Sequence, residues 1–159
     1  MSTRLFAILF VQVAASTVWA GPIAYLPNGK TLLATDVDGT LRLYSPPNTQ
    51  EPTILHAHKG AIFDLAISAD GKRVLTAGAD GCVRVWDPTT WKETATFRGH
   101  TGVVRCVTIS HDSKLAASGG NDKTARLWDP ETGIERLKLE QHPGAVVSVC
   151  FSRDGNLLY

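Results

Sequence analysis

The sequence predicts an all-β protein built from repeated four-stranded antiparallel sheets. The clearest observation is an internal repeat, because His58, His100 and His142 follow one another at intervals of 42 residues. Short apolar or alternating segments lie between Asp-Gly turns, where glycine supplies the positive φ that tight hairpin turns need. No segment carries a sustained apolar period of about 3.6 residues, so we expect no helix.

The same interval connects residues of several other types. They are serines, two sets of turn aspartates, and Trp-Asp-Pro triplets. The members are Ser68, Ser110 and Ser152; Asp70, Asp112 and Asp154; Asp80 and Asp122; and the triplets that begin at Trp86 and Trp128. So many matches at one offset indicate a true structural repeat.

Each repeat is expected to contain four short strands, as the one beginning at His58 illustrates. Its two apolar segments end at the turns Ser-Ala-Asp-Gly71 and Gly-Ala-Asp-Gly81, and two alternating segments follow. Alternation with a period of two is typical of strands that bury one face. The expected strands are 61–67, 73–77, 83–86 and 94–97.

Two segments carry a family resemblance: His58…Val-Arg-Val-Trp-Asp87 and Gly-His100…Ala-Arg-Leu-Trp-Asp129 resemble successive WD repeats. The resemblance extends from about Ile23 to Tyr159. It implies an all-β protein, a β-propeller whose blades are four-stranded antiparallel sheets. The expected blades are 21–57, 58–99, 100–141 and 142–159.

The first and last of these blades depart from the pattern. In the first, Ser16, Ala34 and Tyr44 stand where the family has His, Ser or Thr, and Trp, so this degenerate blade should pack without the polar set. The last blade is truncated, because the sequence stops inside its second expected strand. About three and a half blades make an incomplete ring, whereas closed propellers carry about four to eight blades.

An incomplete ring exposes apolar faces and a strand edge. We therefore expect either a fragment of a longer protein, which supplies the missing blades, or self-association of several chains into a ring. The break inside a strand favours the fragment.

The resemblance also implies a buried hydrogen-bonded set in each blade, formed by a His, a Ser or Thr, an Asp and a Trp. A buried Trp N–H needs an acceptor, which a hydroxyl supplies; the hydroxyl bonds the His, and the His bonds the Asp. These residues are expected to be structural rather than catalytic. The implied sets are His58, Thr76, Asp80 and Trp86; His100, Ser118, Asp122 and Trp128; and His142 alone in the truncated blade.

Partner-binding positions follow from the same resemblance. In WD-repeat proteins, contacts often come from the fifth residue after each His and from the residue before each turn Asp. These positions hold Phe63, Arg105 and Val147, and Ala79 and Asn121. Phe63 has packing between blades as its alternative role, whereas a charge such as Arg105 in an apolar strand should face solvent or a partner.

The N-terminus has the parts of a secretory signal peptide. One positive charge at Arg4 precedes an apolar run at 5–13, and small residues lie near a cut site after Ala20. The run is short and contains Gln12, so it does not predict a membrane span. Residues 1–20 are thus either a signal peptide, which makes the protein exported or periplasmic, or a strand left from an upstream blade in a cytoplasmic protein.

One motif suggests an enzyme. The segment Leu-Leu-Ala-Thr-Asp36-Val-Asp38-Gly-Thr resembles the first motif of haloacid-dehalogenase-like phosphatases, where Asp36 would attack phosphorus, Asp38 would act as acid and base, and Mg²⁺ would assist. However, Asp38 lies 42 residues before Asp80, so the repeat already accounts for it. That family also needs helices around a parallel sheet, and this sequence predicts no helix.

Composition and charge favour a binding protein. The net charge of +1 comes with scattered Lys and Arg, which argues against nucleic acid as a partner. The three cysteines form no C-x-x-C pair, and His56 and His58 lack a third ligand at a suitable spacing, so we expect no metal and no cofactor.

The sequence therefore predicts a non-catalytic protein–protein interaction scaffold that binds other proteins or peptides. Two alternatives remain open. The segment could be a regulatory propeller of an enzyme whose catalytic domain lies elsewhere, or a remnant without function.

Overall fold

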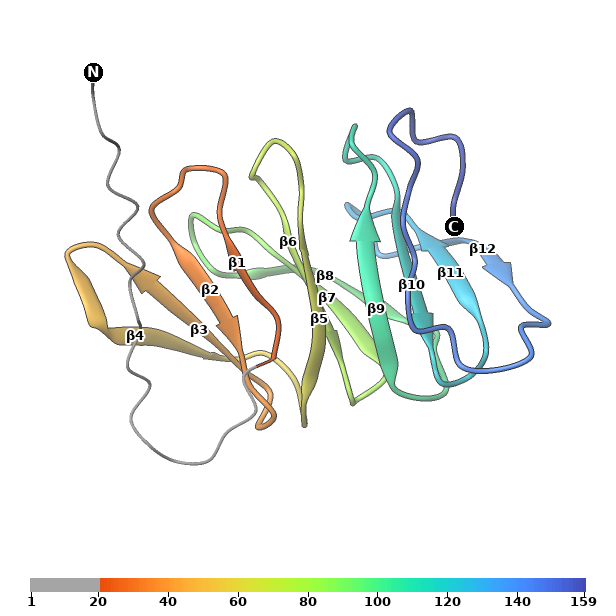
Figure 1. The fold of residues 1–159 in the computed structure, drawn as a ribbon, viewed down its shortest axis with the longest axis horizontal. Coiled ribbons are helices and arrows are strands. Elements are labelled where there is room, and N and C mark those ends of the chain that lie inside the picture. Colours follow the sequence, from red (N-terminus) through yellow and green to blue (C-terminus); the bar gives the residue numbers. More distant parts are fainter. Residues whose placement is uncertain (1–20) are drawn as a thin grey trace, which may run out of the picture.

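The structure, a computed structural model, describes residues 21–159, which form three antiparallel four-stranded sheets and no helix (Figure 1). The all-β prediction is confirmed. In each sheet the strands follow one another in chain order. The strands are β1 (Ile23–Tyr25), β2 (Leu32–Thr35), β3 (Thr40–Ser45) and β4 (Asn48–His56); β5 (Ile62–Ile67), β6 (Val74–Gly78), β7 (Cys82–Trp86) and β8 (Glu93–Arg98); and β9 (Val104–Ile109), β10 (Ala116–Gly120), β11 (Ala125–Trp128) and β12 (Glu135–Leu139).

The signal-peptide prediction for residues 1–20, and Ser16 with it, lies outside the described residues. Each sheet lies inside one of the expected blade ranges: β1–β4 within 21–57, β5–β8 within 58–99, and β9–β12 within 100–141. Among residues 21–159, no helix is long and apolar enough to cross a membrane.

Turn chemistry explains where the strands of each sheet reverse. Between β6 and β7 the chain turns at Asp80-Gly81, and Gly81 takes a φ of 77°, which L side chains adopt rarely. Between β5 and β6 the Ser68 hydroxyl donates to Asp70 at 2.6 Å, and the Gly71 amide donates to the Ser68 carbonyl. The same turn recurs 42 residues later, where the Ser110 hydroxyl donates to Asp112.

The three sheets stand side by side in a row, and the core lies between them (Figure 1). Between the first and second sheets, Leu33 and Leu43 are buried with Val74 and Trp86. Burial of these strand faces supplies most of the stabilisation, at roughly 25 cal/mol for each Å² of apolar area. The fully buried positions between the second and third sheets include Leu75, Val83, Val85, Phe97, Val104 and Trp128.

Two specific contacts join the second and third sheets. The rings of Phe97 on β8 and Trp128 on β11 stack with centroids 5.0 Å apart and planes 15° apart. The Asp64 carboxylate on β5 accepts a hydrogen bond from the Val107 amide of β9 at 2.9 Å. These contacts fix how one sheet sits on the next, beyond the non-directional packing of the core.

After β12 the chain turns back against the third sheet. The Val146 amide donates to the Gly120 carbonyl at 3.0 Å, and Cys150 and Tyr159 exchange two backbone hydrogen bonds of 2.9 Å. Val149 is buried against residues of the third sheet. Residues 146–159 thus form a hairpin at the place where a fourth sheet would begin.

The row of sheets does not close on itself within residues 21–159. It is an incomplete propeller, as the sequence predicts. Every strand pairing in these sheets is antiparallel, which differs from the parallel sheet that a haloacid-dehalogenase-like phosphatase requires. The fold therefore removes the structural basis for a phosphatase built on Asp36 and Asp38.

Candidate functional site

A chain of hydrogen bonds crosses the second sheet from its tryptophan to its turn aspartate. The Trp86 indole donates to the Thr76 hydroxyl at 3.0 Å, and this hydroxyl lies 2.8 Å from Nε2 of His58. On the other side of the ring, Nδ1 of His58 lies 2.8 Å from the Asp80 carboxylate. The structure thus brings together all four residues that the resemblance implied for this blade.

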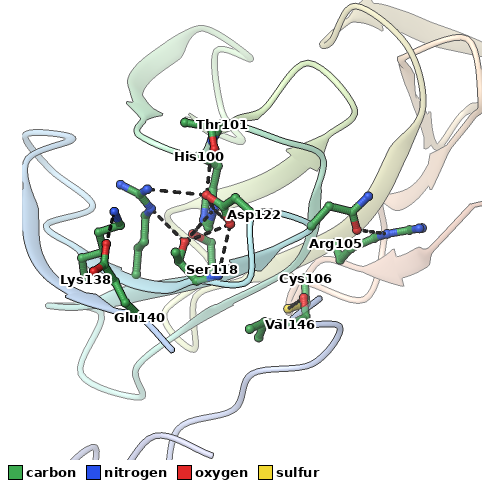
Figure 2. A network of polar contacts seen from close by, with 12 residues as sticks. His100, Thr101, Arg105, Cys106, Ser118, Asp122, Lys138, Glu140 and Val146 are labelled. Carbon is green, nitrogen blue, oxygen red and sulfur yellow. Dashed lines mark hydrogen bonds and ion pairs between the residues drawn. The ribbon is translucent and has the colours of Figure 1, made fainter. Parts of the chain in front are cut away.

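The third sheet repeats the arrangement with a serine in place of the threonine. The Trp128 indole donates to the Ser118 hydroxyl at 2.8 Å, and Nε2 of His100 lies 2.8 Å from the same oxygen. Nδ1 of His100 lies 3.0 Å from both carboxylate oxygens of Asp122. Figure 2 shows His100 between Ser118 and Asp122 in this network.

One tautomer satisfies every donor in these networks. The indole N–H donates to the hydroxyl, the hydroxyl donates to Nε2, and Nδ1–H donates to the carboxylate. A second proton on Nε2 would leave the hydroxyl hydrogen without an acceptor. The side chains of His58 and His100 are 0% and 1% exposed, so both rings are buried in their sheets.

Burial and hydrogen bonding shift the pKa values of both members of each pair. Burial lowers the pKa of His58 and of His100, although the bonded carboxylates oppose the shift. Burial alone would raise the pKa of Asp122, but hydrogen bonds from His100 and Thr124 outweigh it and lower the pKa to about 2. The folded state therefore holds neutral imidazole beside ionised carboxylate at neutral pH.

We expect the protein to lose stability as the pH falls below 6.5, the ordinary pKa of histidine. In this range the two histidines bind protons in the unfolded chain, whereas the buried rings of His58 and His100 stay neutral in the folded protein. Acid therefore favours the unfolded state. Urea unfolding at pH 7.5 and 5.5 measures the effect as a lower midpoint at pH 5.5. Equal midpoints at the two pH values would contradict the neutral-ring assignment.

An arginine that was not predicted joins each network. Arg84 donates to Asp80 at 3.0 Å and to Glu93 at 3.2 Å, which ties β7 to β8. Arg126, 42 residues later, reaches Asp122 at 3.5 Å and Glu135 at 2.6 Å. The same interval of 42 residues was the signal that could have found these arginines.

The two arginines differ at one nitrogen. Nε of Arg126 donates to the Thr124 hydroxyl at 3.1 Å. In the second sheet Cys82 stands at the place of Thr124, and the buried Nε of Arg84 has no hydrogen-bond partner among the described residues. A buried donor left unpaired in this way costs stability.

Replacing Cys82 with threonine should therefore stabilise the protein. Thr40 holds the same position in the first sheet, where Arg42 turns to Asp36 and its Nε stays unpaired. Arg84 reaches the later aspartate as Arg126 does, so the new hydroxyl should accept from its Nε, and we expect a gain of about 0.5–1.5 kcal/mol in the free energy of unfolding. Urea unfolding measures it. Cys82→Val is the matched control, because valine has the shape of threonine without the hydroxyl; an equal gain in both variants would disprove the explanation.

The first sheet replaces the network by a single ion pair. Arg42 donates to Asp36 at 3.0 Å, and Asp36 occupies the position that Gly78 holds in the second sheet. The adjacent Asp38 accepts from Thr40, and these hydrogen bonds lower its pKa although burial opposes the shift. The two aspartates of the phosphatase-like motif thus accept hydrogen bonds from Arg42 and Thr40 at the turn between β2 and β3.

His142 stands apart from the other two histidines. It is exposed, and the structure shows it in no hydrogen-bonded set with a hydroxyl, Asp and Trp among residues 21–159. The implied structural role of His142 stays a prediction.

Three of the five residues expected to bind a partner form one group, in which Arg105 contacts both Phe63 and Asn121. The guanidinium of Arg105 on β9 lies over the Phe63 ring of β5, with its central carbon 4.7 Å from the ring centroid. Nε of Arg105 donates to the Asn121 side-chain oxygen at 3.0 Å. Figure 2 shows Arg105 beside the His100 network. We call Phe63, Arg105 and Asn121 the rim cluster.

The structure does not bring Ala79 and Val147 into such a contact. Ala79 is half-buried in the turn between β6 and β7, where its amide donates to the Ala61 carbonyl. Val147 is 66% exposed in the hairpin that follows the third sheet. The partner-binding role of both residues stays a prediction.

Asp64 is a further residue that sequence reasoning missed. Its two carboxylate oxygens accept from the amides of Leu65 and Val107, and burial raises its pKa although these hydrogen bonds oppose the shift. The signal was a lone acidic residue in the apolar segment 61–67. Its position beside Phe63 places this inter-sheet link directly behind the rim cluster.

Comparisons with known proteins agree with this geometry. The family model described as "WD domain, G-beta repeat" matches residues 49–87, 91–129 and 133–159. The solved structure of U3-55K is similar in fold, with a TM-score of 0.75 and 16% sequence identity; the match covers 82% of this chain and 42% of that one. A search of the curated proteins found no match.

The matched segments also explain how sequence repeats relate to sheets. Segment 49–87 contains β4 of the first sheet with β5–β7 of the second, and segment 91–129 is offset in the same way. Each sequence repeat thus bridges two neighbouring blades, which is the organisation of a propeller. The chain belongs to the WD-repeat family of β-propellers.

Proposed function

We propose that this chain is a non-catalytic scaffold that binds another protein or peptide at the rim cluster. WD-repeat propellers generally bind other proteins and are typically non-catalytic. The observation that carries the proposal is the contact of Arg105 with both Phe63 of the second sheet and Asn121 of the third. Tryptophan, tyrosine and arginine dominate binding hot spots, and an arginine stacked on an aromatic ring offers a similar anchor.

The exposure of the cluster supports the same proposal. Arg105 and Asn121 are exposed and Phe63 is half-buried, so a partner can reach all three. They lie at the end of the sheets where β5 and β9 begin and where β10 turns into β11. The buried networks and Asp64 hold the backbone behind them, and a rigid support reduces the entropy lost on binding.

The two ends of the row of sheets support a second part of the proposal, that further blades complete the ring. Ile23 and Tyr25 are 64% and 57% exposed at one end, and Tyr159 is 71% exposed at the other. The chain spans less than half the length of the U3-55K chain that it matches. We favour blades in a longer polypeptide over a ring of several copies; light scattering of the purified chain distinguishes them, because a stable oligomer would support the ring of copies.

Affinity purification with matched variants tests the interaction surface. The full chain, its Arg105→Glu variant and its Lys114→Glu variant would be used in parallel as bait. Lys114 lies in the turn between β9 and β10, at the opposite end of the same sheet, and its side chain is 82% exposed. A partner lost by Arg105→Glu and kept by Lys114→Glu supports the proposal; a partner kept by both variants contradicts the choice of surface.

A further inference from the structure

We propose that Arg105 binds an acidic group of the partner polypeptide, either the carboxylate of Asp or Glu or the phosphate of a phosphorylated residue. This inference rests on the proposed function and names the chemistry of the partner at the same surface.

Two contacts orient the guanidinium without occupying its outer edge. The Nε–H of Arg105 donates to the Asn121 side-chain oxygen, and the Phe63 ring covers one flat face of the guanidinium. The structure gives the two terminal nitrogens of Arg105 no partner within residues 21–159, and the side chain is exposed. The planar fork is therefore held in place while its terminal N–H groups face solvent.

The other arginines at the starts of strands use their terminal nitrogens differently. The terminal nitrogens of Arg84 donate to Asp80 and Glu93. Those of Arg126 donate to Asp122 and Glu135. Arg105 has a side-chain acceptor for its Nε, as Arg126 has, but no carboxylate from residues 21–159 binds its terminal nitrogens. A partner that supplies one would give these nitrogens the kind of acceptor that the terminal nitrogens of Arg84 and Arg126 already have.

The acidic groups nearest in sequence to the rim cluster are already engaged. Asp122, next to Asn121, binds His100, Thr124 and Arg126. Asp64, next to Phe63, accepts from the Leu65 amide of its own strand and from the Val107 amide of β9. Neither is available to neutralise Arg105, so its charge remains for a partner.

The geometry suits an oxyanion. Guanidinium binds carboxylate and phosphate through two parallel hydrogen bonds, and lysine cannot reproduce this fork. Because Asn121 and Phe63 already hold the side chain, less conformational entropy is lost on binding than for a free arginine. The net charge of +1 favours a polypeptide over a nucleic acid as the source of the oxyanion.

Synthetic peptide arrays test the inference with defined probes. Each array would carry the same set of varied flanking sequences around one central residue: Glu, Gln, phosphoserine or Ser. The labelled full chain should bind the Glu or the phosphoserine array at least about tenfold more tightly than the matched neutral array, since hydrogen bonds to a charged group contribute about that factor. Which acidic array is preferred identifies the source of the oxyanion.

Variants connect the preference to Arg105. Arg105→Gln should remove it, Arg105→Lys should lose most of it because the fork is lost, and Asn121→Ala should weaken it because the fork is no longer held. Lys59→Gln is the matched control, since Lys59 is an exposed cation at the same end of the second sheet and its loss should leave the preference unchanged. Circular dichroism would verify that each variant is folded.

The outcomes separate the inference from the proposed function. If the chain binds acidic and neutral arrays equally and Arg105→Gln changes nothing, the inference is overturned. In that case loss of all peptide binding in Phe63→Ala would still support the rim cluster as the interaction surface. If no peptide on any array binds, both the proposed peptide-binding function and this inference are overturned.

Discussion

Replacing Trp128 with alanine is expected to lower the free energy of unfolding by about 3–5 kcal/mol, which is the range for deleting a large aromatic side chain from a core. Trp128 is 2% exposed, it stacks on Phe97 of the neighbouring sheet, and its indole donates to Ser118. The substitution therefore removes packing between two blades and one hydrogen bond at once. Urea unfolding followed by circular dichroism measures the loss.

A second substitution separates these two contributions. Trp128→Phe keeps an aromatic ring that can stack on Phe97 but removes the indole N–H, so Ser118 and His100 lose one link of their network. We expect a loss smaller than that of Trp128→Ala, with about 1 kcal/mol from the hydrogen bond itself. An unchanged unfolding midpoint for Trp128→Ala would show that this tryptophan does not hold the two sheets together.

The repeat interval made much of this fold predictable. Once His58, Asp80 and Trp86 recur 42 residues later, each must occupy the same place in its own sheet. The strands found at Ile62–Ile67 and Val74–Gly78 lie within one residue of those expected, because Asp-Gly turns mark their ends. Local turn chemistry and the apolar pattern predict the same strands here, and such agreement makes strand positions predictable from the sequence.

Contacts between sheets were not predictable in the same way. Asp64 bonds the backbone of β9, and Arg42 turns to Asp36 rather than to Asp38, although Arg84 and Arg126 reach the later aspartate. The repeat gives the position of each residue within a blade, whereas these bonds depend on what the neighbouring blade or the neighbouring turn offers.

The rim cluster was predictable in its residues but not in their arrangement. The resemblance pointed to Phe63, Arg105 and Asn121 as separate positions, one or two from each blade. That they form one stacked and hydrogen-bonded group depends on the sheet-to-sheet geometry, which places β5 beside β9. Val147 shows the limit of the pattern, because the same repeat position lies in a hairpin with no complete sheet around it.

Gly78→Ala is expected to lower the free energy of unfolding by about 2–4 kcal/mol, from overpacking together with damage to a buried network. A Cβ at Gly78 would lie 2.1 Å from Nδ1 of His58 and 2.8 Å from the Asp80 carboxylate. The ring and the carboxylate would have to separate. Urea unfolding measures the loss, and Gly144→Ala is the matched control because a Cβ there meets nothing within 4 Å.

The first repeat suggests why position 78 must be glycine. There Asp36 fills the place of Gly78, and Ser16 stands in the sequence at the place of His58. A side chain and a histidine ring therefore exclude each other at this point of the blade. In a His58→Ser background, Gly78→Ala should cost much less than in the wild type, and a double-mutant cycle measures the difference as a coupling energy. Equal costs in the two backgrounds would mean that the histidine is not what restricts this position.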